Sequence, residues 1–212
     1  MLKRLLYLGF LSMLVAAMPA QAVNLLTNGN FNTGDFTGWT LSMGDPANMA
    51  IGVDSDGGPD SSPAAVLEDY DPVQWYSAEI SQVLPISAGM SFTESLQYAD
   101  KLFSGAGITL WFYDTATPSG WWDSHVIGYD WQTIVANQNG TIPGDGTWKS
   151  FTSGVITAPA GTVSTLFKIE EYSGNALNST VAFDNVVVTP EPATMLLLGL
   201  GGLALARRRK SA

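Results

Sequence analysis

The side chains best suited to chemistry in this sequence are aromatic rings in two segments rich in turn-forming residues. The rings that could contact a ligand are Trp75, Tyr76, Trp121, Trp122 and Trp131, with Tyr129 close to the last of them. A flat ring can stack on the CH face of a sugar while nearby Asp, Asn or Gln side chains bond its hydroxyls. This pattern favours glycan binding. The alternative is that the rings form the small hydrophobic cores that long loops need.

Catalytic chemistry has weaker support in the sequence. The single histidine, His125, has no G-x-S-x-G or comparable nucleophile motif around it. The adjacent pair Glu170 and Glu171 would point to opposite faces of a strand, whereas glycoside hydrolysis needs two carboxylates that face one bond. The chain has no cysteine, which excludes thiol catalysis and cysteine-bound zinc. We therefore expect no enzymatic activity, with a secreted glycan-active enzyme as the alternative.

The first 22 residues have the composition of a secretory signal peptide. Lys3 and Arg4 precede an apolar stretch from Leu5 to Ala17, and Ala20-Gln21-Ala22 supplies an A-x-A cleavage site. The apolar stretch is too short for a good membrane span. We expect the general export machinery to translocate the chain and signal peptidase to remove residues 1–22.

The expected mature domain, residues 23–189, is strongly acidic. It carries three lysines against eighteen Asp and Glu residues, which is a formal charge of −15. Such a surface repels phosphate backbones, so nucleic acid is not an expected partner. It attracts cations such as calcium, which prefers oxygen ligands, although solubility alone is an equal explanation. The acidic segment Asp54–Asp60 lacks the distal Glu of an EF-hand and is interpreted as a solvated loop.

Short runs rich in Val, Ile, Thr and aromatic residues, separated by Gly, Pro, Asn and Asp, predict a domain built from β-strands. Within one run, Ile108, Leu110 and Phe112 can share a face. The segment 115–146 is less regular and is predicted to be a long loop containing a hairpin. Many short strands with polar turns predict a single all-β domain, an antiparallel jelly-roll β-sandwich. The predicted strands are 38–42, 49–53, 64–68, 78–85, 91–99, 107–114, 147–155, 164–171 and 180–188.

Several segments resemble galactose-binding-like jelly-roll domains, a fold found in several carbohydrate-binding modules. The resemblance lies in NLLTNGNFNTGDFTGWT, ISQVLPISAGMSFTESLQYA, TWKSFTSGVITAPAGTVSTLFKIE and AFDNVVV, in that order. In many such modules a Glu of the opening motif and an Asp of the last strand help to bind a structural calcium. The matching positions here are Asn32 and Asp184. Because Asn keeps an oxygen ligand but loses a charge, the resemblance implies a weakened calcium site or none.

The C-terminal residues 190–212 contain three consecutive signals. Pro190-Glu191-Pro192 is followed by fourteen apolar residues, Ala193 to Ala206, and then by the basic cluster Arg207, Arg208, Arg209 and Lys210. As a helix the apolar run is about 21 Å long, against about 30 Å of bilayer hydrocarbon. Its leucines leave no polar face, and the positive-inside rule keeps the basic cluster in the cytoplasm. We expect a single-pass transmembrane helix in the inner membrane as an intermediate, with the domain outside.

This order of signals closely resembles the PEP-CTERM sorting signal over the last 23 residues, with Thr189 where the common form has Val. The resemblance implies recognition by exosortase, cleavage near Pro-Glu-Pro, and a final place on the surface or in the extracellular matrix of a Gram-negative bacterium. It also implies an association with exopolysaccharide and biofilm. The sequence therefore predicts an exosortase-sorted protein whose sandwich binds polysaccharide. A purely structural matrix or surface protein is the alternative.

Overall fold

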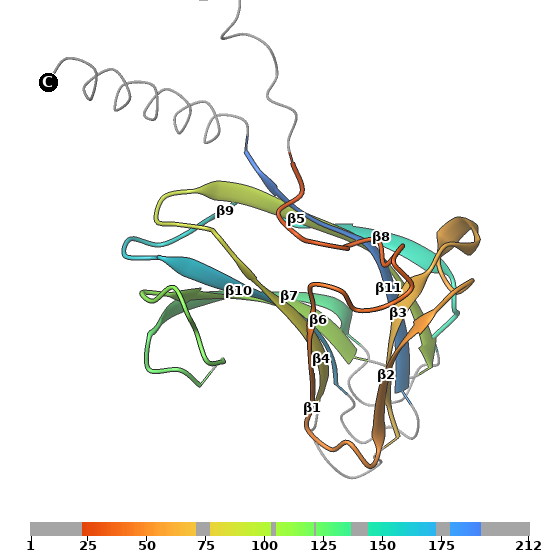
Figure 1. Ribbon diagram of the computed structural model, residues 1–212. Helices are drawn as coiled ribbons and strands as arrows, with labels where there is room; N and C mark the ends of the chain where they lie inside the picture. Colours follow the sequence, from red (N-terminus) through yellow and green to blue (C-terminus); the bar gives the residue numbers. More distant parts are fainter. Residues whose placement is uncertain are drawn as a thin grey trace, which may run out of the picture.

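The computed structural model describes residues 23–70, 77–102, 105–120, 122–136, 144–172 and 179–191. These residues form two antiparallel sheets that pack face to face (Figure 1). The first sheet contains, in spatial order, β1 (Thr40–Met43), β4 (Ser77–Leu84), β10 (Ser164–Tyr172), β6 (Gly105–Tyr113) and β7 (Val126–Ala136). The second contains β2 (Met49–Asp54), β3 (Ala64–Asp69), β11 (Ser179–Pro190), β5 (Ser91–Leu102) and β8 (Trp148–Thr152), with β9 (Ile156–Thr157) paired to β5. A short 3₁₀ turn, η1 (Pro59–Ser61), connects β2 and β3.

The core lies between the sheets and follows the period of two that a half-buried strand imposes. On β6, Ile108, Leu110 and Phe112 point inward and are almost completely buried, as the alternation in the sequence predicts. Antiparallel register brings Leu110 opposite Phe167 of β10, so inward residues of neighbouring strands meet. The all-β class and the sandwich architecture are therefore confirmed.

Strand β7 is the main difference from the predicted elements, because it occupies eleven residues of the segment predicted as a loop. Its pattern is inverted: Tyr129 and Trp131 face outward, while Asp130 and Gln132 lie opposite the inward residues Leu110 and Ile108. An edge strand with a polar inner face does not show the usual alternation. The residues of β7 form a strand because they pair with β6, and not because their own pattern of apolar and polar residues favours one.

The N-terminal segment pairs with the part of β11 that extends beyond its pairing with β3. The Leu25 N–H donates to the Val188 carbonyl, and the Val186 N–H donates to the Gly29 carbonyl, at 2.9 and 2.8 Å. Further along, Thr27 and the Gln82 side chain exchange two hydrogen bonds of 3.0 and 2.7 Å. The segment thus ties the last strand of one sheet to β4 of the other.

Both predicted targeting segments lie largely outside the described residues: the signal peptide of residues 1–22, and Pro192 together with the apolar run and Arg207, Arg208 and Arg209. Within the described ranges, no helix is long and apolar enough to span a bilayer.

Candidate functional site

Four aromatic rings lie on the outer face of the first sheet, on three neighbouring strands. Register pairs Trp111 of β6 with Tyr129 of β7, and their ring centroids are 5.1 Å apart. Trp131 of β7 and Tyr172 of β10 approach to 5.8 Å between ring centroids. We call these four residues the aromatic face.

Two glycines of β6 make room for the rings. A Cβ atom on Gly107 would lie 2.7 Å from Cζ2 of Trp131, and one on Gly105 would lie 2.6 Å from Cε2 of Tyr172. Real side chains do not approach so closely, so each ring rests directly on the backbone of the sheet. The glycines therefore keep this part of the surface flat.

A cluster of charged and polar side chains shares the outer face with the rings. Lys168 of β10 is 5% exposed, and its Nζ lies 2.7 Å from Glu170 Oε2 and 3.1 Å from Glu79 Oε1. The Thr109 hydroxyl also donates to Glu170 at 3.3 Å. Burial raises the pKa of Glu170, although Lys168 opposes this shift. One lysine between two carboxylates leaves a formal charge of −1 beside the rings.

The exposure of the rings decides which of them a ligand could reach. Tyr129 is 66% exposed and Trp131 is 40% exposed, so both present a large free surface. Trp122 is 68% exposed but lies in the loop before β7 and not on the strands. Of the glycan residues expected from the sequence, Trp75, Tyr76 and Trp121 lie outside the described residues. Their role stays a prediction.

Sequence reasoning missed Trp111 and Tyr172. Trp111 belongs to the predicted strand 107–114, and Tyr172 lies one residue beyond the predicted strand 164–171. Each stands two residues from a polar outward residue, Thr109 or Glu170. The alternation indicated that they face away from the core, but only the strand order brings them beside β7. No local signal predicts that β6 lies between β10 and β7.

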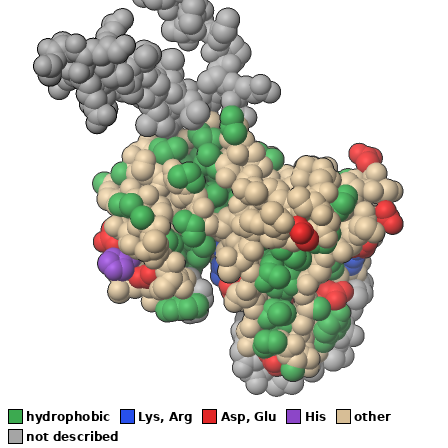
Figure 2. Space-filling model, viewed as in Figure 1, with side chains coloured by type: hydrophobic (Ala, Val, Ile, Leu, Met, Phe, Trp, Pro, Cys, Tyr) green, Lys and Arg blue, Asp and Glu red, His purple; other side chains and the backbone are tan. Residues whose placement is uncertain are grey.

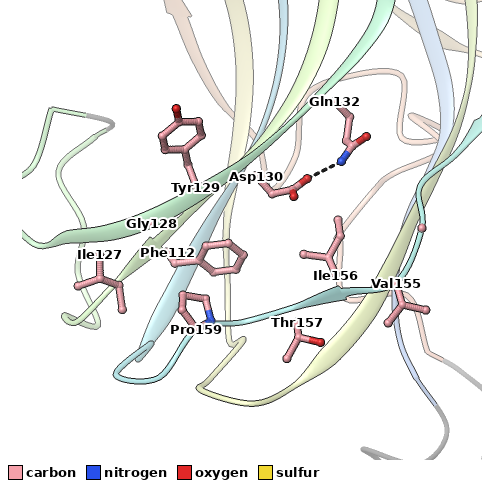
Figure 3. Close-up of a pocket in the computed structure, with 11 residues that line it drawn as sticks. Phe112, Ile127, Gly128, Tyr129, Asp130, Gln132, Val155, Ile156, Thr157 and Pro159 are labelled. Atoms are coloured by element: carbon pink, nitrogen blue, oxygen red, sulfur yellow. Dashed lines mark hydrogen bonds between the residues drawn. The ribbon is translucent and has the colours of Figure 1, made fainter.

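A cavity of about 450 Å³ opens at the edge of the sandwich, between β7 and the segment around β9 (Figure 3). Phe112, Ile127, Ile156 and Pro159 give it an apolar part. Figure 3 shows the Tyr129 ring on the opposite side of β7 from Pro159. We call this the edge cavity. It opens mainly on the inner side of β7, and Tyr129 is the one residue of the aromatic face that also lines it.

Asp130, in the polar part of the edge cavity, interacts electrostatically with a buried carboxyl. Asp130 and Gln132 line the cavity, and the Gln132 amide donates to Asp130 at 2.5 Å. Glu94, on the inner side of β5, is 1% exposed, and neither of its carboxylate oxygens has a hydrogen-bond partner among the described residues. Burial, with a further contribution from the Asp130 charge, raises the pKa of Glu94 to about 8.

The two residues expected to hold calcium have different surroundings. Asp184 is buried, and its Oδ2 accepts hydrogen bonds from Ser62 Oγ at 2.9 Å and Asn185 Nδ2 at 3.2 Å, while Oδ1 accepts from the Asn185 N–H at 2.6 Å. Burial is the main reason that the pKa of Asp184 is raised. Asn32 lies on an exposed turn. Protein donors thus use the Asp184 oxygens, and no group of three or more acidic or histidine side chains in the described ranges could hold a metal. This arrangement does not fit a calcium site built on the two residues.

The remaining titratable candidates are separated from one another. His125 Nδ1 lies 2.7 Å from Asp114 Oδ1, with both side chains about half exposed. Glu170 faces outward, whereas Glu171 faces inward and accepts a hydrogen bond from the Ser179 hydroxyl. Burial raises the pKa of Glu171 to about 8, opposed in part by Ser179. The two adjacent glutamates therefore face opposite sides of β10, as expected.

The start of the C-terminal signal is part of the folded sheet. Strand β11 continues through Pro190, one residue beyond the expected end of the domain, and Pro190 pairs with Phe92 of β5. The Glu191 N–H then donates to the Ser91 carbonyl at 2.8 Å. Val188 directs its N–H away from β5, to the Asn24 side chain at 2.9 Å. Pro190 lies two residues further along the strand, so its backbone nitrogen also faces away from β5. Its missing N–H therefore costs β11 no hydrogen bond to β5.

Comparison with known proteins identifies the C-terminal signal. Residues 188–210 match the PEP-CTERM protein-sorting motif. No curated protein matches the sequence.

Solved structures resemble the domain in fold at low sequence identity. The enzymatically active domain of tailspike protein 4 from bacteriophage CBA120 has a TM-score of 0.59 and 16% identity over 80% of this chain, which spans only 22% of that protein's chain. The module TmCBM61, solved with β-1,4-galactotriose, has a TM-score of 0.51 and 17% identity, covering 80% of this chain and 99% of its own. The Stig cyclase FisC from Fischerella sp. TAU has a TM-score of 0.53 and 17% identity, covering 81% and 99%. The chain thus carries a PEP-CTERM sorting motif behind a jelly-roll β-sandwich with the fold of carbohydrate-binding modules.

Proposed function

We propose that this protein is exported, sorted by exosortase, and binds polysaccharide on the aromatic face of its sandwich. The observation that carries the proposal is the placement of Tyr129 and Trp131 on edge strand β7, exposed and on the same side as Trp111 and Tyr172. Its final place is the cell surface or the extracellular matrix. Exosortase and exopolysaccharide are its partners in this proposal.

The chemistry of the aromatic face suits an extended, uncharged or weakly charged glycan. Tyr129 and Trp131 are two residues apart on one strand, which places them about 6.6–6.8 Å apart along the chain direction. A sugar ring stacks its CH face on such a side chain. Thr133 follows on the same face, and its hydroxyl accepts a hydrogen bond from the Trp131 indole at 3.1 Å. The acidic surface of the domain disfavours strongly anionic polymers.

A glycan array probed with the processed protein tests this function. We expect binding to one class of neutral or weakly charged polysaccharide and its loss in Tyr129→Ala. Tyr70→Ala is the matched control, because Tyr70 is 43% exposed and lies outside the aromatic face. Folded protein that binds no glycan would favour a purely structural role.

Exosortase sorting is tested separately by mass spectrometry of the native protein. We expect the exported form to end near Pro190, because the resemblance to the sorting motif implies cleavage at Pro-Glu-Pro. An exported form that still ends at Ala212 would contradict processing.

A glycan-active enzyme is the second candidate, and the edge cavity is the observation that favours it. A carboxyl of raised pKa beside an ionised one is the arrangement of a general acid and its partner. Here burial, and to a smaller extent Asp130, raise the pKa of Glu94, and Asp130 lines the cavity. We propose binding without catalysis, because Glu94 is almost completely buried and does not line the cavity. Glycan hydrolysis that disappears in both Glu94→Gln and Asp130→Asn would establish the enzyme instead.

A further inference from the structure

Both ends of the described chain leave the sandwich at one place. The hydrogen bond from the Leu25 N–H to the Val188 carbonyl holds the first described residues beside the end of β11. Figure 1 shows the start of the described chain next to the tip of β11. The loop 85–91 and the segment 153–163 adjoin the same end. Ala88 donates to Thr162, β9 within the segment pairs with the start of β5, and residues 153–155 run along β5 next to Glu94. We call this surface the exit end.

Very little chain separates the exit end from the apolar run of the sorting motif. The Glu191 N–H is bonded to Ser91, and Ala193 begins the run with only Pro192 between them. Two residues of extended chain span at most about 7 Å. The headgroup layer on each side of a bilayer is also about 5–7 Å thick. While the run is in the membrane, Glu191 must therefore lie in or against the headgroups.

The composition of the exit end matches this position. The loops 85–91 and 153–163 contain no charged residue, although the domain as a whole is strongly acidic. Their exposed side chains include Val155 and Val163, at 63% and 49%, beside Val23 at 62%. In Figure 2 hydrophobic side chains lie where the chain ends leave and also lower on the same face, and acidic side chains lie lower or toward the right. The loop 114–125, which carries two acids, extends away from the chain ends in Figure 1.

We propose that the exit end is a lipid-contact surface, which rests on the bilayer while the protein awaits processing. Val155 and Val163 then lie at the level of the headgroups, and the acidic sides of the sandwich point away from the membrane. This inference rests on the membrane stage that the sorting motif implies, and not on glycan binding.

Depth-dependent quenching tests this proposal, and the absence of native cysteine makes single labels possible. The uncleaved chain is purified from cells that lack exosortase and placed in nanodiscs of phosphatidylethanolamine and phosphatidylglycerol. Val155→Cys and Val163→Cys carry a fluorophore at the exit end, and the nanodiscs carry a headgroup-level nitroxide. Ala47→Cys is the control, because Ala47 is exposed in the turn before β2 at the opposite end. Circular dichroism shows that each variant is folded.

We expect the nitroxide to quench most of the fluorescence at positions 155 and 163 and little at position 47. Equal quenching at all three positions would overturn the proposal, as would a folded chain that does not enter nanodiscs. Quenching at 155 and 163 only when exosortase is added would assign this surface to the protease instead of the lipid. None of these results affects the glycan array, so the two proposals fail independently.

Discussion

Replacing Glu94 with Gln tests how the sandwich accommodates a charge between its sheets. Glu94 is 1% exposed, and neither carboxylate oxygen has a hydrogen-bond partner within the described ranges. Burial first, and the charge of Asp130 second, raise its pKa from the ordinary value of 4.5 to about 8. The Gln side chain has the shape and volume of Glu but is neutral, so the variant no longer has a carboxyl that titrates at position 94.

The size and sign of the effect follow from this shift. The folded state holds the proton more tightly than the unfolded state, so ionisation of Glu94 opposes folding. The penalty is absent below pH 4.5, grows between 4.5 and about 8, and is constant above that range. At about 1.36 kcal/mol per pKa unit, a rise from about pH 5 to about pH 7.5 costs roughly 3 kcal/mol. The free energy of unfolding of E94Q should therefore gain roughly this amount relative to the unmodified protein over the same rise in pH.

Urea unfolding of both proteins at the two pH values measures this change. We compare the difference in the free energy of unfolding between E94Q and the unmodified protein at each pH. Both proteins contain Glu171, whose pKa is also raised to about 8, so its contribution cancels in this difference. Asp56→Asn, at an exposed acid, is the control and should show the same pH dependence as the unmodified protein. If the difference between E94Q and the unmodified protein is the same at both pH values, Glu94 is not a buried group that titrates near pH 8.

Three further outcomes follow from the contacts of the domain. Gln82→Ala removes both hydrogen bonds to Thr27 and should lower the free energy of unfolding by about 1–3 kcal/mol in urea unfolding. An unchanged unfolding midpoint would show that these two hydrogen bonds are not formed. Lys168→Met leaves the buried Glu170 and the partly buried Glu79 without their cation and should cost about 3–5 kcal/mol by the same assay. A loss as small as that of a surface variant would contradict these ion pairs. Calcium and EDTA should leave the melting temperature unchanged, because protein donors already bond Asp184; a clear rise with calcium would restore the site expected from the sequence.

Local patterns were sufficient to predict most of the fold. The alternation of Ile108, Leu110 and Phe112 predicts their burial because an inward residue on a central strand has apolar neighbours on every side. For segment 115–146 the sequence predicted only a hairpin within a long loop and did not place strand β7, because the inner face of β7 carries Asp130 and Gln132 beside a cavity. Its strand character depends on pairing with β6, which is a tertiary contact.

The candidate site was predictable only in part for the same reason. Trp131 was expected to bind glycan from its residue type and polar neighbours, and it lies on the aromatic face. Trp111 and Tyr172 join that face through strand order, which a single sequence does not encode locally. The sorting motif, by contrast, is contiguous in sequence, so its order of residues was sufficient. That its first proline lies within β11 could be seen only in the sheet.

The most direct measurement for the central proposal is calorimetric titration of the processed protein with the polysaccharide that the array selects. The double variant Y129A/W131A should bind roughly tenfold more weakly or worse, because each stacked ring contributes about 0.5–1.5 kcal/mol. Tyr70→Ala should bind like the unmodified protein. If the folded double variant keeps full affinity while the unmodified protein binds, the aromatic face is not the glycan site.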